Sequence, residues 1–179
     1  MDLREAVGLG TGIAVNPLKG DAASLTPEEF EDRHGSAFLL LTAAELTVPR
    51  GPGATEVSLL DDLPRGESTA GLSLMVFPLR SDESAPGGLV TIGRASNSDL
   101  RVPDLSISRF HAFAKRGEDG YWRIHDAGST NGTTVNGRNA AQQGYGEPEV
   151  LKTGATLRLG QVEFTFLELD ALLGYLAKL

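Results

Sequence analysis

The stretch ATLRLGQVEFTFLEL, residues 155–169, alternates apolar and polar side chains on both sides of a Gly-Gln pair. Its alternating apolar positions are Leu157, Leu159, Val162, Phe164 and Phe166. Side chains two residues apart share one face of a strand, so each half predicts a strand with one buried face. A tight connection that contains glycine joins the two halves, which is typical of a β-hairpin.

Five more segments of strand length lie upstream, and Gly, Asn and Asp turn signals separate them. These segments are residues 72–80, 89–94, 110–116, 121–126 and 133–137. No helical periodicity intervenes to form parallel βαβ units, so the pattern favours an all-β antiparallel sandwich. After the last strand, leucines recur at helical spacing at positions 169, 172, 173 and 176. They predict a short C-terminal helix that packs on the sandwich.

The first 71 residues carry fewer signals. Thr26, Pro27 and Glu29 form a capping-box pattern, which predicts a short helix from Pro27 to about His34. Residues 37–41, AFLLL, fit either a buried strand or part of a helix. The predicted organisation is a partly helical N-terminal segment of unknown function, a Pro- and Gly-rich linker, a β domain and a C-terminal helix, at residues 1–48, 49–71, 72–168 and 169–179.

Composition excludes several classes of function. The 179 residues include no cysteine, so disulfides, thiolate metal sites and cysteine nucleophiles are excluded and a reducing compartment is the simplest location. The longest strongly apolar run, residues 37–41, is too short to cross a bilayer, and the first residues show no leader pattern. We therefore expect a cytoplasmic protein with no membrane partner.

Charge is distributed unevenly along the chain. The formal net charge is -8, and residues 1–71 carry 12 acids against 5 bases, whereas residues 72–179 carry 12 acids against 11 bases. Nucleic-acid binding depends on clustered Lys and Arg, which an acidic first half and a nearly neutral second half do not supply. We expect no nucleic-acid partner.

Four short motifs follow one another within the β domain. They are Gly93-Arg94, Ser108-Arg109-Phe110-His111, Asp126 with Gly128-Ser129-Thr130-Asn131-Gly132-Thr133, and Val135-Asn136-Gly137. This series closely resembles the forkhead-associated (FHA) domain, a β-sandwich family whose members bind phosphothreonine peptides. The resemblance covers roughly residues 72–168. It implies an FHA-type sandwich and a role in Ser/Thr kinase signalling. The short, compact chain favours a bacterial source.

The motif residues suit a phosphate ligand. A phosphothreonine carries a charge of about -1.5 to -2 and three strong acceptor oxygens, so its receptor needs a fixed cation and directed donors. Arg94 supplies a guanidinium fork just after a strand, and Ser108 supplies a short hydroxyl. By resemblance, Arg94, Ser108 and Thr130 would contact the phosphate, and Asn131 would bind the peptide main chain. Arg109 would add positive potential or a second phosphate contact.

Other motif residues are expected to be structural. They are Gly93, His111, Asp126, Gly132, Asn136 and Gly137. In the family the histidine that resembles His111 braces the binding loops from behind. Asn136-Gly137 is the favoured dipeptide of a hairpin turn and needs no ligand. Considered alone, Arg94 could equally form a surface ion pair. The presence of Ser108 and Asn131 in the same series of motifs favours the binding role.

Catalytic and cofactor functions find little support. Ser108, His111 and Asp126 could suggest a hydrolase triad, but Ser108 lacks a nucleophile elbow such as Gly-x-Ser-x-Gly. The sequence GLGTG at residues 8–12 has neither a preceding strand nor the last glycine of a dinucleotide loop. The three histidines have no metal-ligand spacing. We expect a protein that is not an enzyme and uses no cofactor or metal.

The leading hypothesis is a binding module for a phosphothreonine-containing protein or a Ser/Thr kinase. The alternative is a phosphate-independent adaptor or structural subunit, for which the unmatched N-terminal segment would supply a contact surface. A third hypothesis follows from the resemblance, because some bacterial relatives dock their own phosphorylated N-terminal threonine. The candidate acceptors are Thr11, Thr26, Thr42, Thr47, Thr55 and Thr69.

Overall fold

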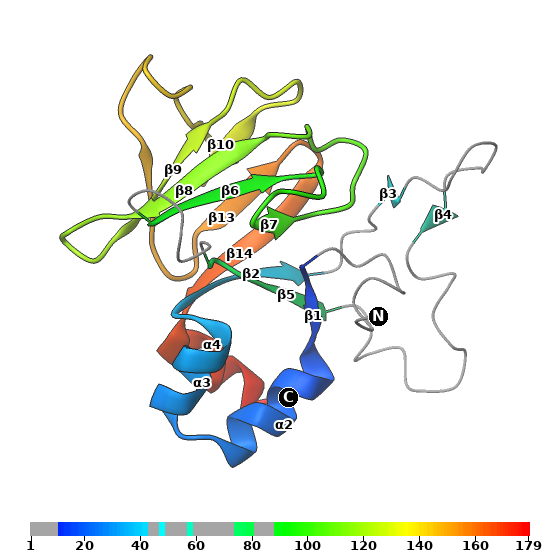
Figure 1. The fold of residues 1–179 in the computed structure, drawn as a ribbon, viewed down its shortest axis with the longest axis vertical. Coiled ribbons are helices and arrows are strands. Elements are labelled where there is room, and N and C mark those ends of the chain that lie inside the picture. Colours follow the sequence, from blue (N-terminus) through cyan, green and yellow to red (C-terminus); the bar gives the residue numbers. More distant parts are fainter. Residues whose placement is uncertain (1–10, 43–46, 49–56, 59–73, 81–87) are drawn as a thin grey trace.

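The computed structural model describes residues 11–42, 47–48, 57–58, 74–80 and 88–179 (Figure 1). Two β-sheets face each other, and three short helices lie against the larger sheet (Figure 1). The predicted β-sandwich and its C-terminal helix are therefore confirmed. No helix among the described residues is long and apolar enough to cross a membrane.

The larger sheet has seven strands, and all of its neighbouring pairs are antiparallel. In spatial order they are β1 Ile13–Ala14, β5 Leu74–Pro78, β2 Ala37–Thr42, β14 Val162–Glu168, β13 Thr156–Leu159, β10 Thr133–Val135 and β11 Arg138–Asn139. The predicted hairpin is present, since Leu157 lies opposite Phe164 and Leu159 opposite Val162.

The smaller sheet has five strands. In spatial order they are β12 Glu149–Leu151, β9 Trp122–Asp126, β8 Ala112–Arg116, β6 Leu89–Gly93 and β7 Leu100–Arg101. Its pairs are antiparallel except β6 with β7, which run parallel. A separate two-stranded ladder joins β3 Thr47–Val48 to β4 Val57–Ser58.

Three helices form a layer of their own. They are α2 Val15–Ser24, α3 Pro27–His34 and α4 Leu169–Leu176. The capping box predicted for α3 is present, because Thr26 Oγ1 accepts from the backbone N–H of Glu29 and Glu29 accepts from the backbone N–H of Thr26. The N-terminal segment is thus partly helical, as expected, although α2 had no clear sequence signal.

Strand β2 is covered on both faces. Leu39 and Leu41 belong to the core between the two sheets. Phe38 and Leu40 belong to a second core, which also contains Phe30 of α3 and lies between the larger sheet and the helices. A strand covered on both sides reads as a continuous apolar run, which explains why AFLLL shows no alternation. The open alternative for this segment is resolved in favour of a strand.

The N-terminal segment contributes directly to the sandwich. Strand β2 lies between β5 and β14, and β1 extends the sheet beyond β5. Thr11 also reaches the smaller sheet, because the backbone N–H of Arg101 donates to its Oγ1 at 3.0 Å. Of the proposed linker 49–71, residues 49–56 and 59–71 lie outside the described residues.

Candidate functional site

The motif residues converge on the loops at one end of the sandwich. Arg94 follows β6, residues 102–111 connect β7 to β8, and residues 127–132 connect β9 to β10. The Gly160-Gln161 turn of the C-terminal hairpin lies beside them, since the backbone N–H of Gly160 donates to the Gly132 carbonyl at 3.0 Å. Segments that are far apart in sequence therefore form one surface.

Arg94 is anchored by its backbone and its side chain. Its N–H donates to the Ser108 carbonyl at 3.0 Å, and its Nε donates to the Ile107 carbonyl at 3.1 Å. This close approach requires Gly93, because a β-carbon there would collide with the Arg109 carbonyl. For the terminal guanidinium nitrogens of Arg94, the structure records no partner within the described ranges. They are available to an anion.

Ser108 and Thr130 meet across the site although 22 positions separate them. The Thr130 N–H donates to Ser108 Oγ at 3.0 Å, and the two hydroxyl oxygens lie 3.5 Å apart, at the limit of a hydrogen bond. Because Ser108 Oγ accepts in the stronger contact, its own proton remains free to donate. The two hydroxyls thus present donors beside the Arg94 loop.

His111 braces the two loops from inside the protein. Its side chain is 0% exposed; the Ser108 N–H donates to Nδ1 at 3.0 Å, and Nε2 lies 3.0 Å from the Gly132 carbonyl. Since Nδ1 accepts, the ring proton resides on Nε2 and is donated to Gly132. Burial lowers the pKa of His111, and the opposing effects of Gly132 and Asp126 do not cancel it. A neutral imidazole therefore joins the loops.

Asp126 organises the loop that carries Thr130. Its carboxylate accepts from the backbone N–H groups of Gly128 and Ser129 at 2.7 and 2.8 Å, and from the hydroxyls of Ser129 and Thr133 at 2.6 and 2.7 Å. Burial alone would raise the pKa of Asp126, but these hydrogen bonds outweigh it and the pKa is lowered. A charged carboxylate therefore holds the loop in shape.

Asn131 is exposed and points its amide at a third segment. Its Nδ2 donates to the Ser106 carbonyl at 2.8 Å. Ser106 is a site residue that the sequence reasoning missed. Its hydroxyl donates to Asp104 at 2.6 Å and accepts from the backbone N–H of Gln161 at 3.0 Å. The available signal was the Asp-Leu-Ser sequence at 104–106, typical of a side-chain-to-backbone turn.

Three predicted residues lie apart from this cluster. Arg109 is exposed beside the site, and no hydrogen bond or ion pair of its guanidinium is recorded in the part of the chain that the structure describes. Asn136 and Gly137 are at the opposite end of β10, where they form the two-residue turn to β11 with φ values of 49° and 79°. Both residues of a type I′ turn have positive φ, so this turn has a purely local explanation.

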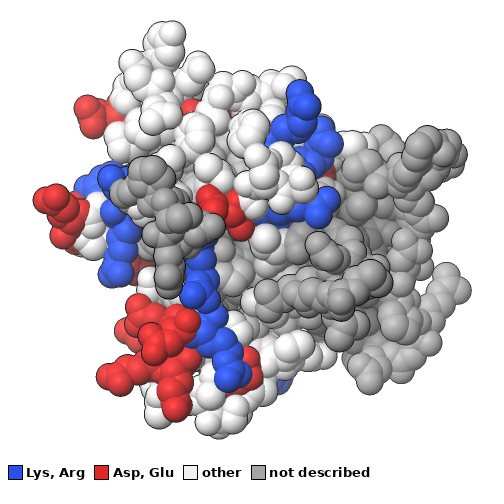
Figure 2. Space-filling view, in the orientation of Figure 1, with Lys and Arg blue, Asp and Glu red and all other residues white. Residues whose placement is uncertain are grey.

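The geometry favours anion binding over catalysis. Both ring nitrogens of His111 are engaged by Ser108 N and Gly132 O, so the ring cannot take a proton from Ser108 Oγ as a triad requires. Within the described ranges, no cluster of three or more His, Asp or Glu could hold a metal ion. Figure 2 shows Lys and Arg gathered at the upper right, where Figure 1 draws the loops between β6 and β8.

The chain is similar in sequence and in structure to known proteins. The family model for the FHA domain matches residues 90–160. The chain is 30% identical over 140 residues to the oxoglutarate dehydrogenase inhibitor of Corynebacterium diphtheriae. The aligned residues make up 77% of this chain and 80% of that protein. It is 30% identical over 101 residues to an ABC transporter ATP-binding/permease protein of Mycobacterium tuberculosis, covering 56% of this chain and only 11% of that protein.

Solved structures of FHA domains also align with the chain. The FHA domain of a Chlamydia trachomatis protein is 26% identical, covers 74% of this chain and 97% of its own, and has a TM-score of 0.46.

Proposed function

Because the chain belongs to the FHA domain family, we propose that it binds phosphothreonine peptides through the loop end of its sandwich. One observation carries the proposal: the Ile107 carbonyl holds the Arg94 guanidinium, and the hydroxyl of the next residue, Ser108, meets Thr130. A phosphate group needs a cation and directed donors at one point, and this cluster supplies both. The chain would act as a binding module in phosphorylation-dependent protein association, with no catalytic step.

The proposed roles follow from the recorded contacts. Arg94 would pair with two phosphate oxygens, and Ser108 and Thr130 would donate to the third. Hydrogen bonds to a charged group contribute roughly 1.5 to 3 kcal/mol each, which suits a reversible affinity. Asn131 would exchange its bond to Ser106 for one to the peptide main chain, and exposed Arg109 would add positive potential.

Calorimetric titration with a pool of phosphothreonine peptides tests this proposal. We expect binding of the phosphothreonine pool, no binding of its unphosphorylated counterpart, and loss of binding in Arg94→Ala. Arg138→Ala is the matched control, because Arg138 is an exposed arginine on β11, beyond the far turn. Binding that survives Arg94→Ala in a folded protein would contradict the proposed pocket.

We place this binding within Ser/Thr kinase signalling, in the cytoplasm, and propose that the chain can also dock its own phosphorylated N-terminal threonine. A tethered ligand benefits from a high effective concentration. Thr26 caps α3 and Thr11 bonds to Arg101, so both hydroxyls already have structural partners. Thr55 and Thr69 lie outside the described residues, and we propose them as the first acceptors to examine.

Kinase treatment followed by intact-mass measurement identifies the acceptor. We expect the phosphorylated chain to bind external phosphothreonine peptide more weakly, and replacement of the modified threonine by valine to restore binding. Unchanged peptide affinity after stoichiometric phosphorylation would contradict self-docking without affecting the proposed reader function.

A phosphate-independent regulatory role is the second candidate. The match to the oxoglutarate dehydrogenase inhibitor spans 140 residues, well beyond the stretch that the FHA family model matches. An assay of purified oxoglutarate dehydrogenase with the unphosphorylated chain tests it. Inhibition that persists in Arg94→Ala would support a contact that does not need the phosphate site, and no inhibition at excess protein would exclude this candidate.

A further inference from the structure

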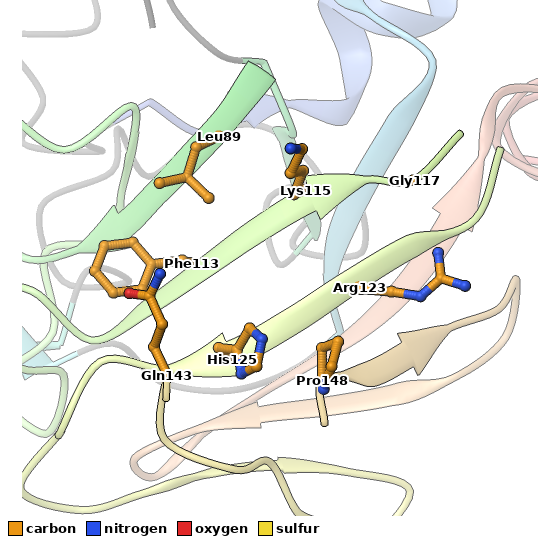
Figure 3. A pocket seen from close by; sticks show the side chains of 8 residues that line it. All are labelled: Leu89, Phe113, Lys115, Gly117, Arg123, His125, Gln143 and Pro148. Atoms are coloured by element: carbon orange, nitrogen blue, oxygen red, sulfur yellow. The ribbon is translucent and has the colours of Figure 1, made fainter. Parts of the chain in front are cut away.

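A pocket lies on the outer face of the smaller sheet, away from Arg94. It has a volume of about 230 Å³ (Figure 3). Its lining residues are Leu89, Phe113, Lys115, Gly117, Arg123, His125, Gln143 and Pro148. Leu89 begins β6, whereas Arg94 follows the other end of that strand. The pocket and the candidate phosphate site are therefore separate surfaces.

The chemistry of this pocket is mainly apolar with one available cation. Phe113 lies opposite His125 in the β8–β9 ladder, and Lys115 lies opposite Arg123 (Figure 3). Arg123 is neutralised by Asp119 through two hydrogen bonds. For Lys115, which is exposed, the described part of the chain offers no recorded ion pair. A complementary ligand would combine an aromatic or aliphatic group with an acid.

The loop before β12 carries such a combination. Tyr145 is 84% exposed, so its ring is accessible to another molecule. Glu147 follows two residues later and is also exposed. The same loop contributes Gln143 and Pro148 to the pocket wall. The loop that carries an exposed aromatic and an acid therefore borders an apolar pocket, which also contains a lysine with no ion pair among the described residues.

We propose that two copies of this chain associate through this face about a two-fold axis. Tyr145 of each copy would fill the pocket of the other against Phe113 and Leu89, and Glu147 would pair with Lys115. A two-fold interface requires one self-complementary patch, and an exposed aromatic on the loop that borders the pocket could supply it. The aromatic contact would supply most of the affinity, and the ion pair would set the orientation.

This association goes beyond the proposed function and does not depend on it. The proposed contacts do not use Arg94, Ser108 or Thr130, so a dimer would present two phosphate sites at once. A ligand with two phosphothreonines, or a clustered receptor, would then be bound by both sites with increased overall affinity. With only one side chain and one ion pair contributed by each copy, the dimer would be weak and concentration-dependent.

Analytical ultracentrifugation of the full chain over a wide concentration range tests the proposal. We expect the mass to rise from 18.9 kDa towards twice that value as concentration increases. Tyr145→Ser should weaken self-association by about tenfold or more, because it removes the central aromatic contact. Tyr121→Ser is the matched control, since Tyr121 is 48% exposed and is not part of the pocket.

A charge exchange separates this interface from nonspecific association. Lys115→Glu alone and Glu147→Lys alone should each weaken the dimer, and the double variant should restore it, because the opposite charges are re-formed with their positions exchanged. A chain that stays monomeric at every concentration would overturn the proposal. So would a dimer that tolerates Tyr145→Ser and shows no recovery in the double variant.

Discussion

Two Asn-Gly pairs lie five residues apart and have different structural settings. Asn136-Gly137 forms a hairpin turn, and the Asn136 side chain bonds to the backbone N–H of Thr156 on the neighbouring strand. Asn131-Gly132 lies in a loop whose contacts come from the segment between β7 and β8, namely Ser106 and His111. The same dipeptide is thus a hairpin turn in one place and part of the proposed binding surface in the other. The two pairs differ because they contact different segments of the chain.

Removing residues 1–42 should have the largest effect, because it disrupts the scaffold that both Asn-Gly pairs share. It deletes β2, which pairs with five residues of β5 and five residues of β14 at the centre of the larger sheet. We expect the shortened chain to lose its cooperative unfolding transition in urea and to bind no phosphopeptide, whereas the full chain shows both. A shortened chain that unfolds cooperatively would show that the remaining strands suffice.

His111→Gln should strongly affect the loop that contains Asn131-Gly132, which His111 braces, and not the Asn136-Gly137 turn. The substitution disrupts a buried bridge from the Ser108 N–H to the Gly132 carbonyl, and we expect a loss of about 3 kcal/mol in unfolding free energy together with weaker peptide binding. The pH dependence gives an independent check. Burial lowers the pKa of His111 below its ordinary 6.5, so the unfolded chain binds the proton more tightly and stability falls as pH drops below that value.

The part of the pH dependence of the unfolding free energy that comes from His111 should vanish in the variant. Urea unfolding of both proteins across this pH range measures it. Equal slopes for wild type and His111→Gln would contradict the assignment of a neutral, buried imidazole.

Asp126→Asn should have a smaller effect, confined to the loop side of β10. Hydrogen bonds from Ser129 and Thr133 hold the pKa of Asp126 below its ordinary 3.8 despite its burial. The stability that this charge contributes is therefore complete above that value and is lost as pH falls through the folded-state pKa. We expect a cost of about 2 kcal/mol at neutral pH, and a weaker acid dependence in the variant, measured by chemical unfolding.

The smallest stability changes are expected from the matched pair Asn131→Ala and Asn136→Ala, which tests the comparison most directly. Asn131 is exposed, so its replacement should alter stability by less than about 0.5 kcal/mol but weaken phosphopeptide binding about tenfold. Asn136→Ala should cost about 1 kcal/mol, because alanine tolerates a positive φ poorly, and leave binding unchanged. The reverse pattern in calorimetry and unfolding would refute the division of roles.

Local patterns in the sequence predicted much of the fold. The alternation of residues 155–169 predicted a hairpin, and the Thr26 capping box predicted a helix at Pro27–His34, because each depends on neighbours along the chain. The motif spacing also identified Arg94, Ser108 and Thr130, which the structure brings together; their role in binding stays a prediction.

Features that depend on contacts between distant segments needed the tertiary structure. The sequence alone could not decide whether AFLLL was a strand or a helix, because a segment buried on both faces shows no alternation. The contribution of Ser106 depends on Asn131 and Gln161, which lie 25 and 55 positions away. Likewise, the proposed docking of Tyr145 depends on a pocket that residues of β6, β8 and β9 form together. Sequence by itself determined the local elements and the residue types at the site, and folding decided which of them meet.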